Sequence, residues 1–314
     1  MSHEIVVLDG YAMNPGDLSW EPLKELGTVR LYDRTDAADT IQRIGNADIV
    51  LTNKVVIDEK VMDACPNMKY VGITATGVNM IDLPAAARHG ICVTNVPAYS
   101  TDSVAEMTFA LLLEMTMHTG LHNAAVQEGR WVTSPLFCFW DAPLTEIKGK
   151  TLGIIGYGSI GKAVAAIGRA FGMRVIANSP HGNDPCQVDL DTLLRESDII
   201  SLHCPLKADN RHLINRETIA KMKPGVLLIN TARGPLVDAD ALKEALLSGR
   251  IGGVGMDVID VEPMRPDYPL LGVKNCVITP HVAWATLEAR QRLMSVVTEN
   301  VRRFLAGDPQ NCVH

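Results

Sequence analysis

Three ionisable side chains in the second half of the chain are of types that could together bind a carboxylate and transfer a proton. They are Arg233, Glu262 and His281, and each follows a short apolar run. An arginine presents a planar fork to a carboxylate, and a histidine exchanges a proton near neutral pH. A glutamate beside that histidine can orient the ring and favour its charged form. Taken singly, each residue also has an ordinary structural explanation, as part of an ion pair or as a loop residue before a helix.

A glycine-rich segment supplies a second chemical signal. Gly156, Gly158 and Gly161 are spaced as G-x-G-x-x-G, directly after the apolar run at 151–155 and at the start of a predicted helix. In that setting the first glycine permits a tight turn, the second admits a pyrophosphate, and the third lets the helix lie close to the strand. Backbone N–H groups at the helix N-terminus then bind the anion. The segment predicts a dinucleotide site, and the alternative is an ordinary turn.

The sequence gives a weaker signal for the choice between NAD and NADP. An acidic residue about 20 residues beyond the glycines usually binds the ribose hydroxyls of NAD, but here the second strand ends at Asn178 and Ser179, and the first carboxylate is Asp184. Between Asn178 and Cys186 there is no Lys or Arg for a 2′-phosphate, and only His181 could add positive charge. Ser179 can donate or accept a hydrogen bond and repels nothing. We expect NAD as the cofactor, with NADP also usable.

Short β-branched runs alternate with helical segments along the whole chain, which is the pattern of parallel α/β sheets. A capping box at 103–106 predicts one long helix from Ser103 to about Gly129, and a last helix is expected at 286–305. Arg233, Glu262 and His281 come just after strands, at the edge where such sheets bind ligands. The expected strands are 5–8, 29–31, 49–51, 70–73 and 91–93, then 151–155, 175–177, 199–202, 226–229, 254–256 and 277–278.

The length of 314 residues favours two domains. We expect the α/β class, with two doubly wound parallel-sheet domains. Residues 101–283 would form a Rossmann NAD(P)-binding domain. Residues 1–100 and 284–314 would form a discontinuous, flavodoxin-like substrate domain.

Composition excludes several functional classes. With 47% hydrophobic and 21% charged residues the chain can bury a core, yet no run of about 18 uncharged apolar residues could span a bilayer. The formal net charge is −7 and long basic clusters are absent, which disfavours nucleic acid as a partner. The seven cysteines form no C-x-x-C pair, and no signal peptide is visible. A reducing, cytoplasmic location is therefore expected.

The remaining histidines form no recognisable constellation. His118 and His122 are four residues apart and share a helix face, but no H-E-x-x-H motif accompanies them. A dimer or core face explains them better, and no metal site is expected. We assign structural roles to His89, His203 and His212.

Several motifs in order resemble one family. The segments G-Y-G-S-I-G from Gly156, N-T-A-R-G from Asn230, 257–263 and Pro280-His281 together resemble the D-isomer-specific 2-hydroxyacid dehydrogenase family. The resemblance covers nearly the whole chain, including L-T-N-K and A-T-G-V-N-M-I-D in the first hundred residues. It implies an oxidoreductase that transfers a hydride between NAD(P)H and a small 2-keto acid, with a D-2-hydroxy acid as the other reactant.

The resemblance also implies roles for single residues. His281 would be the acid/base, Glu262 its partner, and Arg233 the clamp on the substrate carboxylate and carbonyl. Asp257 would face the nicotinamide, and backbone N–H groups around Gly77 would receive the carboxylate. The implied cofactor contacts are Gly156, Gly158, Ser159, Ile160, Gly161, Ser179, Cys204, Pro205, Thr231, Ala232, Asp257 and His281, and the implied substrate contacts are Lys54, Thr76, Gly77, Arg233 and His281.

Within the family, the loop at 137–140 and the run H-V-A-W-A-T from His281 look most like the glycerate dehydrogenase, or hydroxypyruvate reductase, branch. The expected pairs are hydroxypyruvate/D-glycerate or glyoxylate/glycolate. The resemblance implies a homodimer and a substrate domain that closes over the cofactor domain. Two departures are Asn210, where the family often has Thr, and Ser179, where it often has Asp. The alternative function is a non-enzymatic NAD(H) sensor, because corepressors of this fold retain the glycine fingerprint.

Overall fold

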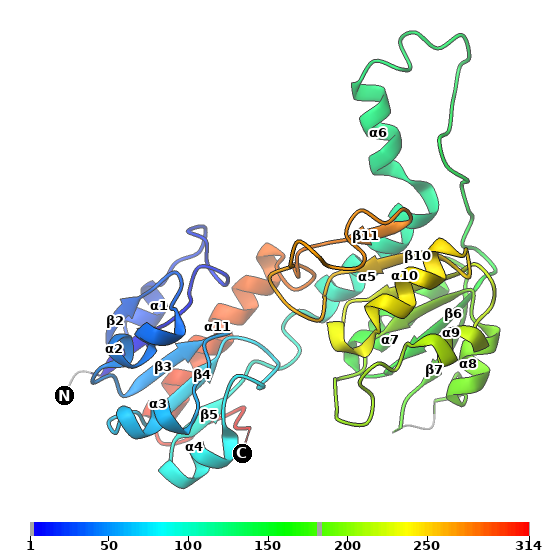
Figure 1. The fold of residues 1–314 in the computed structure, drawn as a ribbon. Coiled ribbons are helices and arrows are strands. Elements are labelled where there is room, and N and C mark those ends of the chain that lie inside the picture. The colour runs from blue at the N-terminus through cyan, green and yellow to red at the C-terminus, as the bar shows by residue number, and fades with distance from the viewer. Residues whose placement is uncertain (1–2, 181–183, 314) are drawn as a thin grey trace. The chain divides into compact units, whose positions relative to one another are not determined.

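The chain divides into two compact units (Figure 1). The computed structural model describes residues 3–180 and 184–313. Unit 1 comprises Met1–Ser100 and Ala285–His314, and unit 2 comprises Thr101–Trp284. Each unit has one parallel sheet with helices against it, so the predicted α/β class is confirmed.

The sheet of unit 1 has five strands in the order β2-β1-β3-β4-β5, and every pairing is parallel. This is the flavodoxin-like strand order. All residues of β3 and β4 are buried, as expected for central strands covered on both faces. The strands are β1 (Glu4–Val7), β2 (Thr28–Leu31), β3 (Ile49–Thr52), β4 (Tyr70–Ile73) and β5 (Cys92–Thr94).

Local capping explains where several helices of unit 1 begin and end. Asp82 caps the start of α4 (Leu83–His89) by accepting a hydrogen bond from the N–H of Ala85 (3.0 Å). The same helix ends at Gly90, whose φ of +67° suits glycine. Thr286 caps the last helix through the N–H of Ala289 (3.3 Å). The helices of unit 1 are α1 (Glu21–Lys24), η1 (Ala37–Asp39), α2 (Thr40–Ile44), α3 (Glu59–Ala64), α4 (Leu83–His89) and α11 (Leu287–Leu305).

The C-terminal tail covers the β5 edge of this sheet. The N–H of Asn95 donates to the carbonyl of Asn311 (3.2 Å), and the N–H of Val313 donates to that of Val93 (3.1 Å). The tail therefore runs antiparallel beside β5. Asn300, buried on α11, anchors it by accepting from the Asn311 amide (2.8 Å) and donating to the Asn95 carbonyl (3.0 Å).

The sheet of unit 2 has six parallel strands in the order β11-β10-β9-β8-β6-β7. The chain places β7 on one side of β6 and then β8 on the other. Such a reversal marks the point where open α/β sheets bind ligands, beyond the carboxyl ends of the strands. The strands are β6 (Thr151–Ile155), β7 (Arg174–Asn178), β8 (Ile199–Leu202), β9 (Val226–Asn230), β10 (Ile251–Met256) and β11 (Cys276–Ile278).

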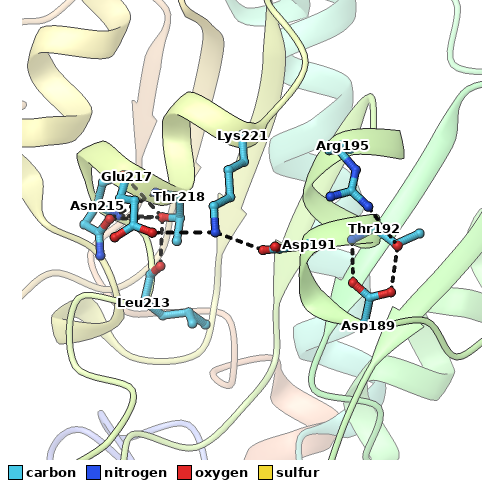
Figure 2. Close-up of polar contacts among 9 residues, drawn as sticks. All are labelled: Asp189, Asp191, Thr192, Arg195, Leu213, Asn215, Glu217, Thr218 and Lys221. Carbon is cyan, nitrogen blue, oxygen red and sulfur yellow. Dashed lines mark hydrogen bonds and ion pairs between the residues drawn. The ribbon is translucent and has the colours of Figure 1, made fainter.

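Helix capping in unit 2 follows the same rules, and Figure 2 shows two adjacent examples. Asp189 accepts a backbone hydrogen bond from the first turn of α8 (2.8 Å). Asn215 and Thr218 form a reciprocal capping box at the start of α9 (3.1 and 2.9 Å). The helices of unit 2 are α5 (Thr101–Met117), α6 (Thr119–Gln127), α7 (Ser159–Ala170), α8 (Leu190–Glu196), α9 (Arg216–Lys221), η2 (Gly234–Leu236) and α10 (Ala239–Leu247).

The prediction of one helix from Ser103 to Gly129 is wrong in two respects. Two helices, α5 and α6, meet at His118, whose φ of +49° interrupts the helical path. In addition, α5 begins at Thr101, so Ser103 lies in its first turn. The Ser103 hydroxyl donates to the carbonyl of Ala283 instead of capping the helix.

Residues 119–146, which include α6 and the loop after it, form an arm that extends away from the unit 2 sheet (Figure 1). Arg130 pairs with both carboxylate oxygens of Asp141 (2.5 and 3.0 Å) and lies over the ring of Phe139. The N–H of Asp141 donates to Nε2 of His122 (3.2 Å). These contacts tie the two limbs of the arm together. Its exposed large apolar side chains include Leu121, Trp131, Val132, Leu136, Phe137, Trp140 and Leu144.

No helix within residues 3–180 and 184–313 is long and apolar enough to cross a bilayer. The same ranges contain no group of three or more His, Cys, Asp or Glu side chains arranged to hold a metal ion.

Candidate active site

The turn between β6 and α7 shows why its glycines are needed. Gly156 has a φ of +99°, and a Cβ there would lie 2.4 Å from the backbone nitrogen of Cys204. A Cβ at Gly161 would lie 2.2 Å from the carbonyl oxygen of Gly156. Around Gly158, by contrast, no atom of the described residues beyond its own chain neighbours lies within 4 Å of the Cβ position. The first and third glycines therefore permit close packing, and the second leaves space for a ligand.

The first turn of α7 is open to an anion. Gly158 is the N-cap, Ser159 is exposed and Ile160 is half-buried. The first N–H groups of any α-helix lack partners inside the helix, and the helix end carries partial positive charge. Together with the space at Gly158, these groups fit the pyrophosphate of a dinucleotide. The residues present thus fit the cofactor that the glycine motif implies.

The end of β7 adjoins this turn. The N–H of Gly156 donates to the carbonyl of Asn178 (2.8 Å), so Ser179 follows directly beside the glycine turn. Asp184 accepts a hydrogen bond from the N–H of Cys186 (3.1 Å) and serves the local turn. The predicted contribution of His181 lies outside the described residues. Ser179 is therefore the described side chain best placed to meet a ribose in this segment.

The segment after β8 forms the other side of the cofactor position. The N–H of His203 donates to the carbonyl of Ile155 (2.7 Å), which brings Cys204 and Pro205 beside the glycine turn. Asn210 holds this segment by donating to the Pro205 carbonyl (2.8 Å). Asn210, which stands where the family often has Thr, therefore anchors this segment locally. Burial lowers the pKa of His203 to about 3, so its ring is neutral.

Arg233 is presented by a turn that Asn230 organises. The buried Asn230 side chain accepts from the N–H of Ala232 (3.0 Å) and donates to the carbonyl of Arg233 (2.8 Å). The Thr231 hydroxyl contacts that of Thr108 on α5 (3.2 Å). Arg233 itself is half-buried and donates one hydrogen bond to the Ala232 carbonyl (2.7 Å). A guanidinium has five N–H donors, so several can still serve a ligand.

Gly234 brings the Arg233 turn against the segment that carries Glu262. A Cβ at Gly234 would lie 1.9 Å from the carbonyl oxygen of Ile259 and 2.4 Å from the nitrogen of Asp260. Only glycine allows this approach. The close packing places the segments of Arg233 and Glu262 side by side at the carboxyl end of the sheet.

His281 and Glu262 form a direct pair. Nδ1 of His281 lies 2.6 Å from Oε2 of Glu262, and both side chains are about one-third exposed (28% and 32%). The other oxygen, Oε1, accepts from the N–H of Ile259 (3.2 Å). The carboxylate therefore orients the imidazole through Nδ1 and leaves Nε2 as the nitrogen for a substrate.

Asp257 supports the loop that carries His281. Its side chain is buried, with 1% exposure, and accepts from the hydroxyl of Thr279 (2.6 Å) and the N–H groups of Val282 (2.9 Å) and Ala283 (2.9 Å). The implied role beside the nicotinamide stays a prediction. The hydrogen bonds found for its carboxylate serve the backbone around His281.

Two further residues hold this loop, and sequence reasoning missed their roles. The indole N–H of Trp284 donates to the carbonyl of His281 (2.9 Å). Ser103 of α5 binds the carbonyl of Ala283. The motif H-V-A-W-A-T contained Trp284, but a motif does not reveal which backbone group an indole will meet. Ser103 begins a capping-box pattern, which predicts a helix cap and gives no sign of this contact.

The substrate residues predicted in unit 1 are Lys54, Thr76 and Gly77. The Asp9 carboxylate accepts the N–H groups of Asn53 (2.8 Å) and Lys54 (2.6 Å), which fixes the loop after β3 and leaves the Lys54 side chain exposed. The Thr76 hydroxyl donates to the backbone within unit 1, and Gly77 is half-buried. These three residues belong to unit 1, whereas Arg233, Glu262 and His281 belong to unit 2.

A cavity of about 800 Å³ lies elsewhere in unit 2. It is lined by residues that precede or begin strands, including Asp198, Val226 and Gly252, and by His118 and Leu121 near the base of the arm. His281, Glu262 and the glycine turn all follow the carboxyl ends of strands. This cavity is therefore not the catalytic site.

Comparison with known proteins covers both units. The model of the D-isomer specific 2-hydroxyacid dehydrogenase NAD binding domain matches residues 109–283. A hydroxypyruvate reductase of Blautia hydrogenotrophica is 49% identical over 320 residues, which cover 99% of each chain.

Solved structures are similar over the same extent. A D-lactate dehydrogenase of Aquifex aeolicus, determined with NAD and lactic acid, is 32% identical with a TM-score of 0.83, covering 98% of this chain and 96% of that one. An acyclic imino acid reductase, determined with NADPH and D-Arg, is 33% identical with a TM-score of 0.86, covering 99% and 100%.

Proposed function

The chain belongs to the D-isomer-specific 2-hydroxyacid dehydrogenase family, and we propose that its own reaction is the reduction of hydroxypyruvate to D-glycerate. The predicted family, the oxidoreductase activity and NAD(P) as the cofactor are confirmed. The alternative of a non-enzymatic sensor finds no support in these relatives. The relative at 49% identity supports hydroxypyruvate as the keto acid, and glyoxylate is the second candidate.

The observation that carries this proposal is the contact of 2.6 Å between Nδ1 of His281 and Oε2 of Glu262. When bound, NAD(P)H supplies the hydride that adds to the keto carbon. The reaction then needs one proton for the keto oxygen. Protonated His281 donates it from Nε2, while Glu262 keeps the ring oriented. In the reverse direction His281 takes the proton back from the hydroxyl.

Arg233 accounts for the preference for acids. Its guanidinium is always charged and matches a carboxylate with two parallel hydrogen bonds. It also polarises the neighbouring keto group, since positive charge there stabilises the developing oxyanion. The packing of Gly234 on Ile259 keeps this cation beside the segment of Glu262.

We propose a shallow preference for NAD over NADP. Ser179 follows the end of β7 next to the glycine turn and carries no charge to repel a 2′-phosphate. A phosphate of about −1.5 to −2 charge normally recruits Arg or Lys, and the segment from Asn178 to Cys186 contains neither. Neither nucleotide is strongly excluded on these grounds.

We propose that the chain forms a homodimer through the arm. Phe137 and Val132 are 88% and 87% exposed, and the arm is held in shape by Arg130 and Asp141. A preformed apolar surface of this kind marks an interface. A second copy of the chain is the partner that the family resemblance implies. Light scattering should give twice the chain mass, and Phe137→Asp should shift it to one chain. A wild-type monomer at micromolar concentration would contradict the proposal.

Lys54, Thr76 and Gly77 remain predicted substrate contacts, with unit 1 as the substrate-binding unit and unit 2 as the nucleotide-binding unit. The cytoplasmic location also remains a prediction from the sequence.

The proposed reaction is tested by mixing the protein with NADH or NADPH and a panel of keto acids, and following absorbance at the nicotinamide band. Hydroxypyruvate should give the highest kcat/KM, glyoxylate the next, and pyruvate and bulkier keto acids less. Arg211→Lys, an exposed change in unit 2, is the control for Arg233→Lys, which should lose about 100-fold in kcat/KM because the fork is lost. Absence of turnover with every keto acid would overturn the proposal.

A further inference from the structure

Two thiols of unit 1 lie side by side, and the catalytic machinery does not use them. Sγ of Cys92 on β5 is 3.9 Å from Sγ of Cys312 in the C-terminal tail. We propose that these residues form a redox-modification site, in which a peroxide joins them in a disulfide that fixes the tail to β5. This inference does not depend on the proposed reaction.

The backbone presents the two thiols on one face. Cys312 pairs with Thr94 in the antiparallel bridge between the tail and β5. Cys92 is two residues before Thr94, so its side chain points to the same face of the strand. Cys92 is thus the diagonal neighbour of Cys312, a relation in which longer side chains reach each other. The contact of 3.9 Å between the sulfur atoms follows from this register.

The two sulfur atoms need to move only a short distance to form a disulfide bond. A disulfide bond is about 2.05 Å long, so the sulfur atoms must move together by about 2 Å. Cys312 is exposed and pairs with β5 through an isolated bridge, whereas Cys92 belongs to a paired strand. The tail can therefore supply the movement. Asn300 and Asn311 keep the tail in register, so the two thiols are already in contact in the reduced protein.

The chemistry assigns different roles to the two sulfurs. The exposed Cys312 attacks the O–O bond of the peroxide, forms a sulfenic acid and releases one water. The Cys92 sulfur then attacks the Cys312 sulfur, the S–O bond breaks, and the second water leaves with the Cys92 proton. Two thiols and one hydrogen peroxide thus give one disulfide and two waters. Burial, and secondarily the Cys312 thiol, raise the pKa of Cys92, so the exposed Cys312 is the thiol that meets the peroxide first.

The cross-link would have a structural consequence. The two residues are 220 positions apart in the sequence, so the disulfide closes a very long loop. Cross-links over long loops restrict the unfolded chain most. Oxidation should therefore raise the unfolding midpoint of unit 1 by about 5 °C or more.

The test is to oxidise the full-length protein with a small excess of hydrogen peroxide and map its peptides without reduction. A peptide pair containing Cys92 and Cys312 should appear, and dithiothreitol should remove it. Thiols titrated after denaturation should fall from seven to five, because seven are present and each disulfide consumes two. The oxidised protein should melt at higher temperature.

Matched variants separate this pair from general oxidation. Cys92→Ser and Cys312→Ser should each abolish both the linked peptide and the gain in melting temperature, and Cys138→Ser in unit 2 should retain both. The wild-type peptide map stands even if one variant folds poorly. The proposal is overturned if Cys312 is oxidised only to sulfinic or sulfonic acid, or if thiols are lost without a Cys92–Cys312 linkage.

Discussion

The carboxylate of Asp257 accepts the backbone N–H of Ala283 at 2.9 Å. Its other oxygen accepts the N–H of Val282 (2.9 Å) and the hydroxyl of Thr279 (2.6 Å), so the backbone on both sides of His281 is tied to the end of β10. His281 has a φ of +55°, which is uncommon for a residue other than glycine. The Asp257 carboxylate thus helps to maintain the conformation from which the imidazole reaches its position.

Replacing this carboxylate should damage catalysis and stability together. Asp257→Asn keeps the shape but turns one acceptor into an NH₂ group that faces a backbone N–H. We expect kcat to fall about 100-fold, since small displacements of catalytic groups have effects of that size, and the free energy of unfolding to fall by about 1–3 kcal/mol. Steady-state kinetics and urea titration measure both. Asp260→Asn, an exposed neighbour, is the control. A folded Asp257→Asn enzyme with normal kcat would refute this role.

The glycines of the turn should separate folding from cofactor binding. Gly158→Ala adds a methyl group to open space at a φ of −80°, which alanine accepts, so the melting temperature of the free protein should be unchanged. The methyl group should weaken NADH binding about 10-fold or more, because it occupies the proposed pyrophosphate position. Gly156→Ala, which collides with Cys204, should instead destabilise the fold. Fluorescence titration with NADH provides the measurement. Unchanged affinity in Gly158→Ala would exclude this turn as the phosphate site.

His203 should make stability depend on pH. Burial lowers its pKa to about 3 from an ordinary value near 6.5, so between these values the unfolded chain binds a proton that the native protein does not. Stability is therefore lost as pH falls below about 6.5. His203→Asn should lose less free energy of unfolding between pH 7 and pH 5 than the wild type does. Urea titrations at the two pH values give this difference. Equal losses in both proteins would show that His203 does not contribute.

Ser179→Asp should sharpen the choice of nucleotide. A carboxylate there would bind the 2′-hydroxyl of NADH and repel the 2′-phosphate of NADPH, so kcat/KM should fall at least about 10-fold more for NADPH than for NADH. Ser179→Asn, of similar size but neutral, is the matched control. The two cofactors are compared in all three proteins. If the wild type strongly prefers NADPH, then a basic residue from another part of the chain reaches the ribose.

The sequence predicted those parts of the molecule that depend on local pattern. All the expected strands are present, because β-branched runs bounded by turn residues are local signals. The glycine motif also has the geometry expected of it, since Gly156 and Gly161 permit close packing and Gly158 leaves open space. His281 and Glu262, which the family resemblance pairs, lie in direct contact, and their catalytic roles stay predictions.

Features that depend on distant partners were not predicted. The hydrogen bonds of Asp257 reach residues 22 to 26 positions later in the chain, and nothing in the local pattern indicates them. The break between the two helices lies at His118, which has a left-handed backbone conformation although it is not glycine. The sequence therefore has no glycine or proline at that position to indicate that the helix ends. The pairing of the tail with β5 joins segments more than 200 residues apart. The contact of Cys92 with Cys312 therefore could not be predicted from the local sequence around either residue.

The proposed reaction depends most on His281 as the proton donor. The direct test is kcat for hydroxypyruvate reduction by His281→Ala, with NADH affinity measured in the same preparation and His89→Ala, an exposed histidine of unit 1, as the control. We expect kcat to fall by about 10² to 10⁴ with NADH affinity little changed, and the control to retain wild-type activity. A folded His281→Ala protein that reduces hydroxypyruvate at the wild-type rate would contradict the account.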